Sequence, residues 1–311
     1  MKETKKFVTQ FITNLHSHAK GDKCSVLISM IFDTYKNTSV PICISLQTGQ
    51  SQKLPFNYQL CIDLEGYEEI VVFGKFYFCG KYSRINEWFE RWSYELGYNV
   101  KNSAWETLQC GLMLPSHAHS LTSIYGTIFA IGSKIAQYMH ISNKKSWFQM
   151  DSPIYPIVFA ALFARNERLL YALGGFSDIT LSKKSNNIQY LDVKGRNGWN
   201  VVKMPNLYGI CKCKCIQPTN DEIIIIGGKQ KEVYQIGFKS NEDVDIHLMT
   251  TLGHTDSLEA TMCPIYWNGS YNLLSRSGVF YRYFRKRKTL KMKKDWMEDE
   301  LHIYPRWYGG L

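Results

Sequence analysis

The chain has 311 residues, of which 45% are hydrophobic and 14% aromatic, and its formal net charge is +10. This composition is typical of a globular protein with a sizeable core and excludes a disordered chain. No run of about eighteen uncharged apolar residues occurs, so the sequence predicts no membrane insertion. The charged N-terminus lacks the apolar segment of a secretory signal, and the nine cysteines have no disulfide or metal spacing. We therefore expect free thiols and an intracellular location, first the cytoplasm and as the alternative the nucleus.

Short apolar segments recur along the chain, and most of them end at a glycine. They are rich in β-branched and aromatic residues and are bounded by Gly, Asn, Ser and Pro, which predicts strands joined by turns. In chain order they are residues 26–32, 70–74, 128–132, 169–175, 223–228 and 271–275. The glycines that end the four clearest copies are 58, 43 and 53 residues apart. Repeats of this period are typical of propellers and solenoids.

Aromatic residues keep step downstream of these glycines. Tyr138 precedes Trp147 by nine residues, Tyr190 precedes Trp199 by nine, and a proline follows each tryptophan after six. Tyr94 and Trp105 form a looser copy, and the aromatic strand continues at Tyr234 and Tyr283. The alternative fold, a β-sandwich, gives no reason for this regular spacing of Tyr, Trp and Pro. A propeller does, because aromatic side chains of the outer strands fill the interfaces between neighbouring sheets.

The best local match to a known repeat is Leu-Pro-Ser-His-Ala-His-Ser at residues 114–120, followed by Gly-Thr-Ile-Phe-Ala-Ile-Gly at residues 126–132. This pattern resembles the kelch repeat, although the full double glycine occurs only at Gly174-Gly175 and Gly227-Gly228. The resemblance covers about residues 22–298. It implies an all-β fold, a six-bladed kelch-like β-propeller of four-stranded antiparallel blades, as a single domain over residues 1–311, with each glycine strand second from the axis. We expect residues 5–15 or 299–308 to close the ring.

The residue patterns of common catalytic and metal sites are absent, and the chain is expected to have no catalytic residues, metal or cofactor. The run from Cys211 to Cys215 alternates cysteine with lysine, so a strand would place three thiols on one face. That spacing favours a core strand over a metal site, which needs a fourth ligand and a turn.

Two segments with aromatic residues, 76–84 and 176–187, follow glycine strands and are interpreted as loops. The resemblance implies that such loops lie on one rim beside the connections between blades, a rim that commonly binds partners. An open alternative is that the aromatics of the first segment continue into the blade core. The candidate partner-binding residues are Phe76, Tyr77, Tyr82, Arg84, Ser116, His117, Phe176 and Asp178.

Seven basic residues and no acidic residue occur in residues 285–294. They are Arg285, Lys286, Arg287, Lys288, Lys291, Lys293 and Lys294. Three interpretations stay open: a solvated outer hairpin, a contact with an acidic protein or RNA, and a nuclear import signal.

Together these features predict a non-catalytic protein-interaction module, a subunit or adaptor that binds a protein partner through rim loops. The first alternative is a ribonucleoprotein or nucleic-acid-associated component that uses the basic residues 285–294. The second is a propeller enzyme whose site is assembled from scattered loops.

Overall fold

The computed structural model describes the backbone of residues 26–33, 38–45, 51–53, 68–72, 75–81, 93–99, 104–107, 119–142, 146–195, 197–202, 210–211, 213–219, 222–227, 232–251, 265–267, 270–274, 280–284 and 289–292. Side chains are described, with gaps, between residues 120 and 249. This part of the chain is all-β and is built from antiparallel sheets, mostly of four strands. Within it, no helix has the length and apolar character required to cross a membrane.

The strands pair with their neighbours in the sequence, so every described sheet is an antiparallel meander. The first sheet holds β1 (Val26–Asp33), β2 (Thr38–Ser45) and β3 (Ser51–Lys53). The next two hold β4 (Glu68–Val72), β5 (Lys75–Lys81), β6 (Ser93–Asn99) and β7 (Ala104–Thr107), then β8 (His119–Ile124), β9 (Thr127–Gly132), β10 (Ile135–His140) and β11 (Phe148–Gln149). Two more hold β12 (Ala161–Arg165), β13 (Leu169–Leu173), β14 (Ile188–Asp192) and β15 (Asn200–Val202), then β16 (Cys213–Thr219), β17 (Glu222–Gly227), β18 (Glu232–Phe238) and β19 (Val244–Thr251). The last holds β20 (Ile265–Trp267), β21 (Ser270–Leu274), β22 (Phe280–Phe284) and β23 (Thr289–Met292).

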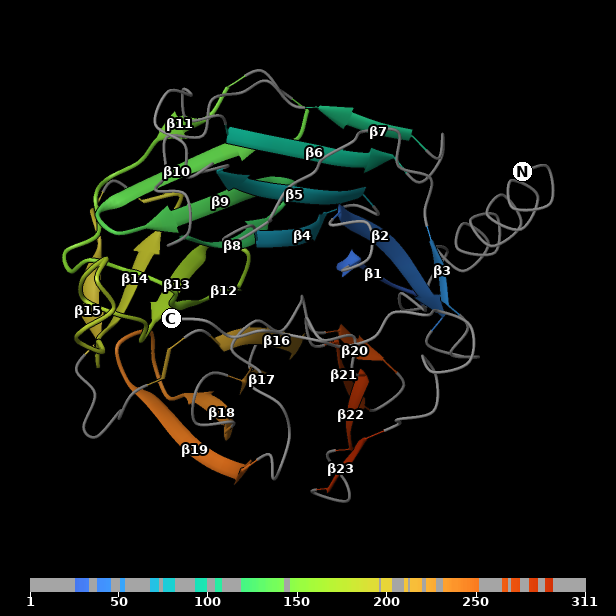
Figure 1. Ribbon diagram of the computed structural model, residues 1–311. Helices are drawn as coiled ribbons and strands as arrows, with labels where there is room; N and C mark the ends of the chain where they lie inside the picture. Colours follow the sequence, from blue (N-terminus) through green and yellow to red (C-terminus); the bar gives the residue numbers. More distant parts are fainter. Residues whose placement is uncertain are drawn as a thin grey trace.

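The sheets lie around a common centre, as Figure 1 shows, with β4, β8, β12, β16 and β20 toward that centre and the last strand of each sheet at the outside. Contacts join these first strands in order, from β4 to β8, β12, β16 and β20. Each sheet can therefore pack a face on each neighbouring sheet, which buries apolar area that a lone four-stranded sheet would expose.

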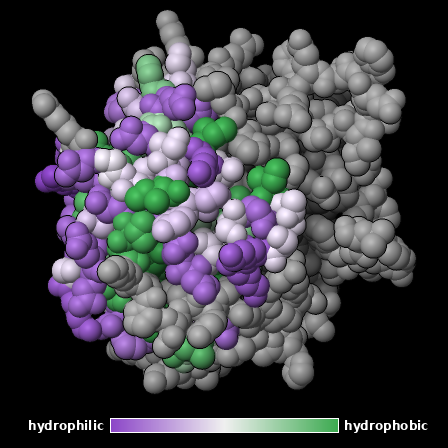
Figure 2. Space-filling model, turned by 90° about the vertical axis from the view of Figure 1, so that its left-hand side faces the viewer, coloured by the Kyte–Doolittle hydropathy of each residue, from purple (hydrophilic) through white to green (hydrophobic). Residues whose placement is uncertain are grey.

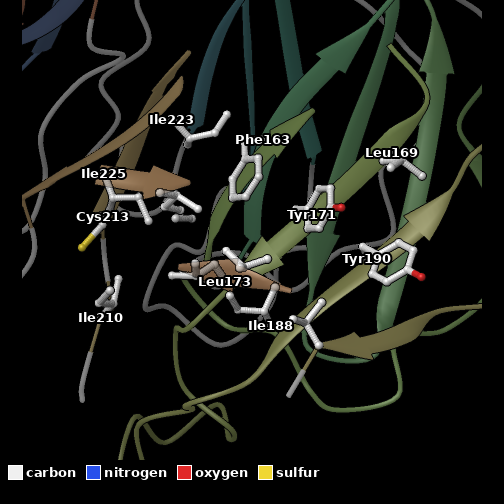
Figure 3. Close-up of a cluster of buried hydrophobic side chains, with 14 residues drawn as sticks. Phe163, Leu169, Tyr171, Leu173, Ile188, Tyr190, Ile210, Cys213, Ile223 and Ile225 are labelled. Atoms are coloured by element: carbon white, nitrogen blue, oxygen red, sulfur yellow. The ribbon is translucent and has the colours of Figure 1, made fainter. Parts of the chain in front are cut away.

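Sheet β12–β15 shows how alternation along a strand fills both interfaces. In β13, Leu169, Tyr171 and Leu173 belong to the hydrophobic cluster between this sheet and β16–β19, shown in close-up in Figure 3. Leu170 and Ala172 point the other way, into the cluster shared with β8–β10. Because both faces are buried, β13 reads as a continuous apolar run rather than as an alternation of apolar and polar residues.

The aromatic phasing has a structural counterpart. The tyrosines of the repeat all lie in the third strands of their sheets: Tyr94 in β6, Tyr138 in β10, Tyr190 in β14, Tyr234 in β18 and Tyr283 in β22. Trp147 and Trp199 each lie directly before a fourth strand, and both are buried. Trp199 packs among residues of the preceding sheet, as the sealing role requires.

Three of the four glycine-ended segments, those that end at Gly132, Gly175 and Gly228, belong to second strands, as predicted. The segment at residues 70–74 does not, because β4 is the first strand of its sheet and only residues 73–74 separate it from β5. Glycine is common in hairpin turns as well as at the end of a second strand, and sequence period alone does not distinguish these two uses.

The interpretation of residues 76–84 as a loop was wrong for residues 76–81, which belong to β5. Phe76 and Tyr77 lie in β5, which pairs with β4 on one side and β6 on the other. Aromatic residues have high strand propensity, and the two neighbouring strands can satisfy the backbone groups of β5. These two residues are therefore inside a sheet and not on a loop.

Several predicted residues lie outside the described part of the chain. They are Tyr82, Arg84, Ser116, His117, Arg285, Lys286, Arg287, Lys288, Lys293 and Lys294, together with residues 5–15 and 299–308. Of the basic run, Lys291 is described at the backbone level, in β23 opposite Arg282 of β22.

Candidate binding surface on the loop rim

A short ladder of backbone pairs joins chain segments from neighbouring sheets at one end of the strands. Ser133 pairs with Ile157, Val158 with Phe176, and Phe176 with Lys184. The amide of Ser133 donates to the carbonyl of Ile157 at 2.6 Å, and the amide of Phe176 donates to the carbonyl of Val158 at 2.7 Å. The connections β9–β10, β11–β12 and β13–β14 thus lie at one end of the strands, which we call the loop rim. The kelch resemblance implied this shared end for the β13–β14 loop and the connection between sheets.

The glycine pair makes the departure from β13 onto this rim possible. Gly174 and Gly175 have φ of +67° and +83°, a region that side chains disfavour. A Cβ on Gly174 would overlap the carbonyl oxygen of Ile210, and one on Gly175 would overlap that of Val158. The amide of Gly175 also donates to the carbonyl of Ile210 at 2.7 Å, which ties the loop to the segment before β16.

Phe176, predicted as an exposed partner contact, is buried beneath the rim with Val158 and Cys211. The backbone reversal at Gly175 turns the next side chain inward, where its amide is paired with Val158. Phe176 therefore anchors the loop and does not present its ring to a partner.

Cys211 belongs to this anchor and not to the face predicted for all three thiols. β16 begins only at Cys213, and Cys213 and Cys215 pack in the cluster between β12–β15 and β16–β19. Burial raises the pKa of both of these thiols above the ordinary range, so they are protonated side chains of the core. Among the described residues, no group of three or more His, Cys, Asp or Glu could hold a metal ion.

Asp178 organises the exposed tip of the β13–β14 loop. Its Oδ1 accepts hydrogen bonds from the Thr180 hydroxyl at 2.9 Å and the Ser182 amide at 3.0 Å, and its Oδ2 accepts one from the Ser182 hydroxyl at 2.6 Å. These bonds, those from Ser182 first, lower the pKa of Asp178 to about 2. The carboxylate is charged at physiological pH and is used by the loop itself. Beside it, Ile179 is 64% exposed.

Two more exposed side chains, Ile154 and Tyr155, lie on the β11–β12 connection, which is hydrogen-bonded to residues of the next sheet. Gln189 is buried in β14, where its Oε1 accepts from the Tyr155 amide at 2.9 Å and its Nε2 donates to the Tyr155 carbonyl at 3.0 Å. The Trp199 indole donates to the carbonyl of Asp151 at 2.8 Å. This fixed connection exposes 46% of Ile154 and 43% of Tyr155.

Sequence reasoning missed Ile154, Tyr155 and Gln189. One signal was present: a glutamine inside the apolar strand Ile188–Asp192 is a buried amide that must find partners. The identity of those partners was not readable, because Gln189 and Tyr155 are 34 positions apart.

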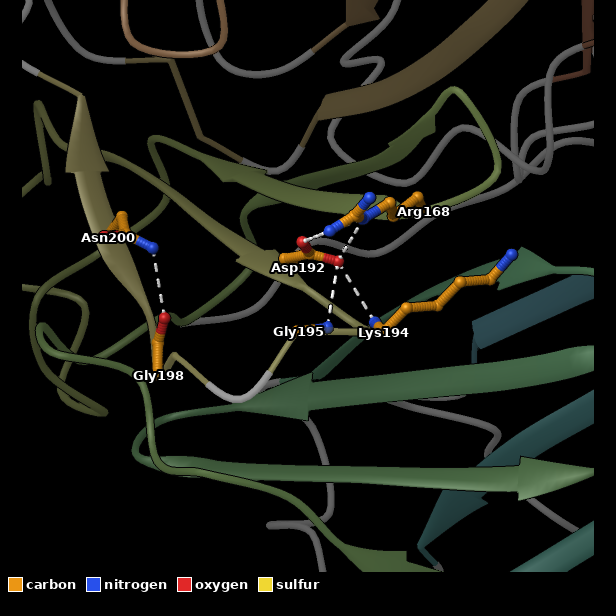
Figure 4. Close-up of polar contacts among 6 residues, drawn as sticks. All are labelled: Arg168, Asp192, Lys194, Gly195, Gly198 and Asn200. Atoms are coloured by element: carbon orange, nitrogen blue, oxygen red, sulfur yellow. Dashed lines mark hydrogen bonds and ion pairs between the residues drawn. The ribbon is translucent and has the colours of Figure 1, made fainter.

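The opposite ends of the strands form a turn rim with a different character. Figure 4 shows Asp192 of β14 accepting from the Nε of Arg168 at 2.7 Å and from the amides of Lys194 and Gly195, each at 3.1 Å. The hydrogen bond from Arg168 is the main reason that the pKa of Asp192 is lowered. These contacts close the β14–β15 turn and hold it to the β12–β13 turn. On the same rim Tyr125 is 58% exposed.

No family model matches the chain, and no curated protein matches it. Among solved structures, 366 chains match. One, described as "Structure of YjhT", has a TM-score of 0.61 and 14% sequence identity, and the match covers 82% of this chain and 91% of that one. At this identity the likeness is one of fold, and it extends over most of both chains.

Proposed function

We propose that the chain is a six-bladed kelch-like β-propeller that serves as a non-catalytic protein-interaction module, a subunit or adaptor that binds a protein partner through the loop rim. The meander sheets around one centre, the third-strand tyrosines and the paired tryptophans support the architecture. The kelch relationship rests on the sequence pattern of glycines and aromatics.

One observation carries the binding proposal: the loop rim exposes Ile154, Tyr155 and Ile179 on segments whose backbones are already held in place. Gln189 clamps the first segment, and Asp178 closes the second. A rigid loop loses little conformational entropy when a partner binds, so exposed apolar side chains on it are effective anchors. Figure 2 views the outer side of the described sheets and shows hydrophobic side chains gathered within a largely hydrophilic face.

The polar groups of the rim also fit binding better than catalysis. The Asp178 carboxylate accepts from its own loop, and the Gln189 amide is engaged by the backbone of Tyr155. Groups so used position the surface and are not directed at a reacting atom. Tyr82, Arg84, Ser116 and His117 stay predicted members of the same binding surface.

The test compares exposed residues on the two rims: Tyr155 and Ile179 on the loop rim, and Tyr125 on the turn rim. A partner that co-purifies stoichiometrically from native extract is titrated against the Tyr155→Ala, Ile179→Asp and Tyr125→Ala variants. The first two should each weaken binding at least about tenfold, the equivalent of 1.4 kcal/mol, while Tyr125→Ala on the turn rim should leave it unchanged.

The same titration examines the nucleic-acid alternative with a Lys286/Arg287/Lys288→Glu variant at several salt concentrations. Binding that survives the rim variants, is abolished by charge reversal and falls steeply with salt would reject the rim proposal. It would place the ribonucleoprotein alternative first.

A further inference from the structure

The outermost strand of the fifth sheet differs from the other outermost strands in its length. β19 has eight residues, whereas β3, β7, β11, β15 and β23 have two to four. β18 is its only partner among the described strands, and Figure 1 shows β19 at the periphery of the ring. A long strand at the edge of a sheet presents a row of backbone N–H and C=O groups that can pair with another strand.

The residues of β19 divide between two faces. Val244 is buried, and Ile246 packs on the cluster between the β12–β15 and β16–β19 sheets. Leu248 belongs to the same face by alternation but is 56% exposed. Asp245 and His247 alternate with these residues and take the opposite face, where His247 is exposed. The strand therefore carries apolar side chains on one face, the last of them open to water, and an acid and a base on the other.

Residues 244–248 are the regular part of this strand. Each of them pairs in turn with a residue of β18, and the last of these pairs is Leu248 with Tyr234. The register then shifts, so that the next pair is Thr250 with Val233. Such a bulge bends a strand and interrupts regular pairing. A second partner would thus meet a regular edge over five residues.

The turn that leads into this edge is fixed to the neighbouring sheet. The Tyr171 hydroxyl donates to the carbonyl of Asn241 at 3.2 Å, and Nη1 of Arg165 donates to Oδ1 of Asn241 at 3.0 Å. The Tyr190 hydroxyl donates to Oε1 of Glu242 at 3.2 Å. A strand that is held in place before it binds loses little conformational entropy when it pairs.

We propose that residues 244–248 pair antiparallel with the same residues of a second copy of the chain, about a two-fold axis at Ile246. In this register Ile246 lies opposite its own counterpart, and Leu248 lies opposite Val244 of the second copy. Directly opposite residues share one face of a sheet, so the apolar side chains of the two strands meet and cover the exposed area of Leu248.

The same register brings opposite charges together. Asp245 lies opposite His247 of the second copy, and the two-fold axis makes this pair occur twice. An imidazole has an N–H that can donate to a carboxylate in either protonation state. The sequence Val-Asp-Ile-His-Leu is therefore complementary to itself when it is reversed.

Other registers lose this match. A shift by one residue places Ile246 opposite His247 of the second copy and Leu248 opposite its Asp245, so apolar side chains meet charged ones. A shift by two residues places either two Asp245 or two His247 side chains opposite each other, which is unfavourable for like charges. The side-chain pattern thus selects one register among the antiparallel pairings.

This inference goes beyond binding at the loop rim and does not depend on it, because the edge of β19 is a different surface. A dimer formed in this way carries two loop rims. A partner with two binding segments would then bind more tightly than a partner with one, since its second contact forms within the same complex.

Sedimentation velocity of the full chain tests the proposal at concentrations up to about 0.5 mM, because five paired residues on each side make a small interface and a weak complex. The unaltered chain should shift reversibly from monomer to dimer. His247→Asp places two acids opposite each other and should weaken the association at least about tenfold. Phe148→Asp, at an exposed position of the outermost strand β11, is the matched control and should leave the association unchanged.

A mixing experiment examines the identity of the partner and the register. Asp245→Lys should also weaken association, because two bases then lie opposite each other. An equimolar mixture of the Asp245→Lys and His247→Asp variants should form a mixed dimer, since each acid again faces a base. Urea unfolding of each variant separates loss of pairing from loss of the fold.

Three results would overturn the proposal. They are a monomer at every concentration in the unaltered chain, a dimer that His247→Asp leaves intact, and a mixture of the two folded variants that stays monomeric. Binding of the co-purified partner to the loop-rim variants is a separate readout, so failure of this pairing and failure of the rim proposal are distinguishable.

Discussion

Replacement of Trp199 by alanine tests the idea that outer aromatics seal neighbouring sheets. The side chain is only 6% exposed, lies in the cluster between β8–β10 and β12–β15, and donates its indole hydrogen to Asp151 on the β11–β12 connection. Truncating a buried tryptophan costs about 3–5 kcal/mol through lost burial and the cavity that remains. Because a domain is stable by about 5–15 kcal/mol, this substitution alone should remove a large part of the total.

The assay is equilibrium unfolding in urea, with Trp199→Phe as the companion variant. Phenylalanine keeps most of the apolar area but leaves the Asp151 carbonyl without its donor, so it should cost about 1–3 kcal/mol less than alanine does. Phe148→Ala, in the outermost strand and 41% exposed, is the surface control and should cost less than Trp199→Ala. A cost below about 1 kcal/mol for Trp199→Ala would refute the sealing role, because it would mean that the side chain is not buried between sheets.

Three further outcomes are expected. Gly175→Ala should lower the urea midpoint of unfolding, because the φ of Gly175 is +83° and a Cβ there would overlap a carbonyl oxygen. Gly237→Ala is the matched control, because a Cβ on Gly237 meets nothing within 4 Å. Equal effects of the two substitutions would contradict the need for glycine at position 175. Asp178→Asn should flatten the dependence of the melting temperature on pH in acid. The pKa of Asp178 is lowered from 3.8 to about 2, so the carboxylate contributes stability that is present above pH 3.8 and lost as the pH falls toward 2. An unchanged slope between those pH values would argue against the role of Asp178 in holding the loop tip. Gln189→Leu should destabilise the fold by about 1–3 kcal/mol, because it leaves the amide and the carbonyl of Tyr155 unpaired. The variant should also be cleaved faster by proteases in the β11–β12 connection. Resistance to proteolysis equal to that of the unaltered chain would show that the Gln189 side chain is not needed to hold this connection.

Local chemistry explains why much of the strand pattern was predictable. A strand buried on both faces must be apolar throughout, so β13 and β17 stand out as continuous runs. Tyrosines of the third strand and tryptophans before the fourth recur because each sheet meets its neighbour in the same way. Period and residue type therefore predicted the all-β class, one apolar strand in each described sheet and the strands that hold the repeat tyrosines.

Where the prediction failed, the same local signal had two structural outcomes. An aromatic run after a glycine fits a rim loop or a second strand, and only pairing with β4 and β6 shows that Phe76 and Tyr77 are in a strand. Phe176 follows a glycine in the same way, but the reversal at Gly175 turns it into the core. Cys211 is separated from its two companions because β16 begins after it.

The sequence by itself determined the all-β class and the position of one apolar strand in each described sheet, because these depend on residue type and spacing within a few tens of residues. The tertiary structure alone decided what the rim exposes. The Gln189 clamp on Tyr155 and the anchor of Phe176 on Val158 join segments from different elements of the fold. A side chain's exposure is set by what packs against it from elsewhere in the chain, so the candidate surface of Ile154, Tyr155 and Ile179 became visible only when the sheets were assembled.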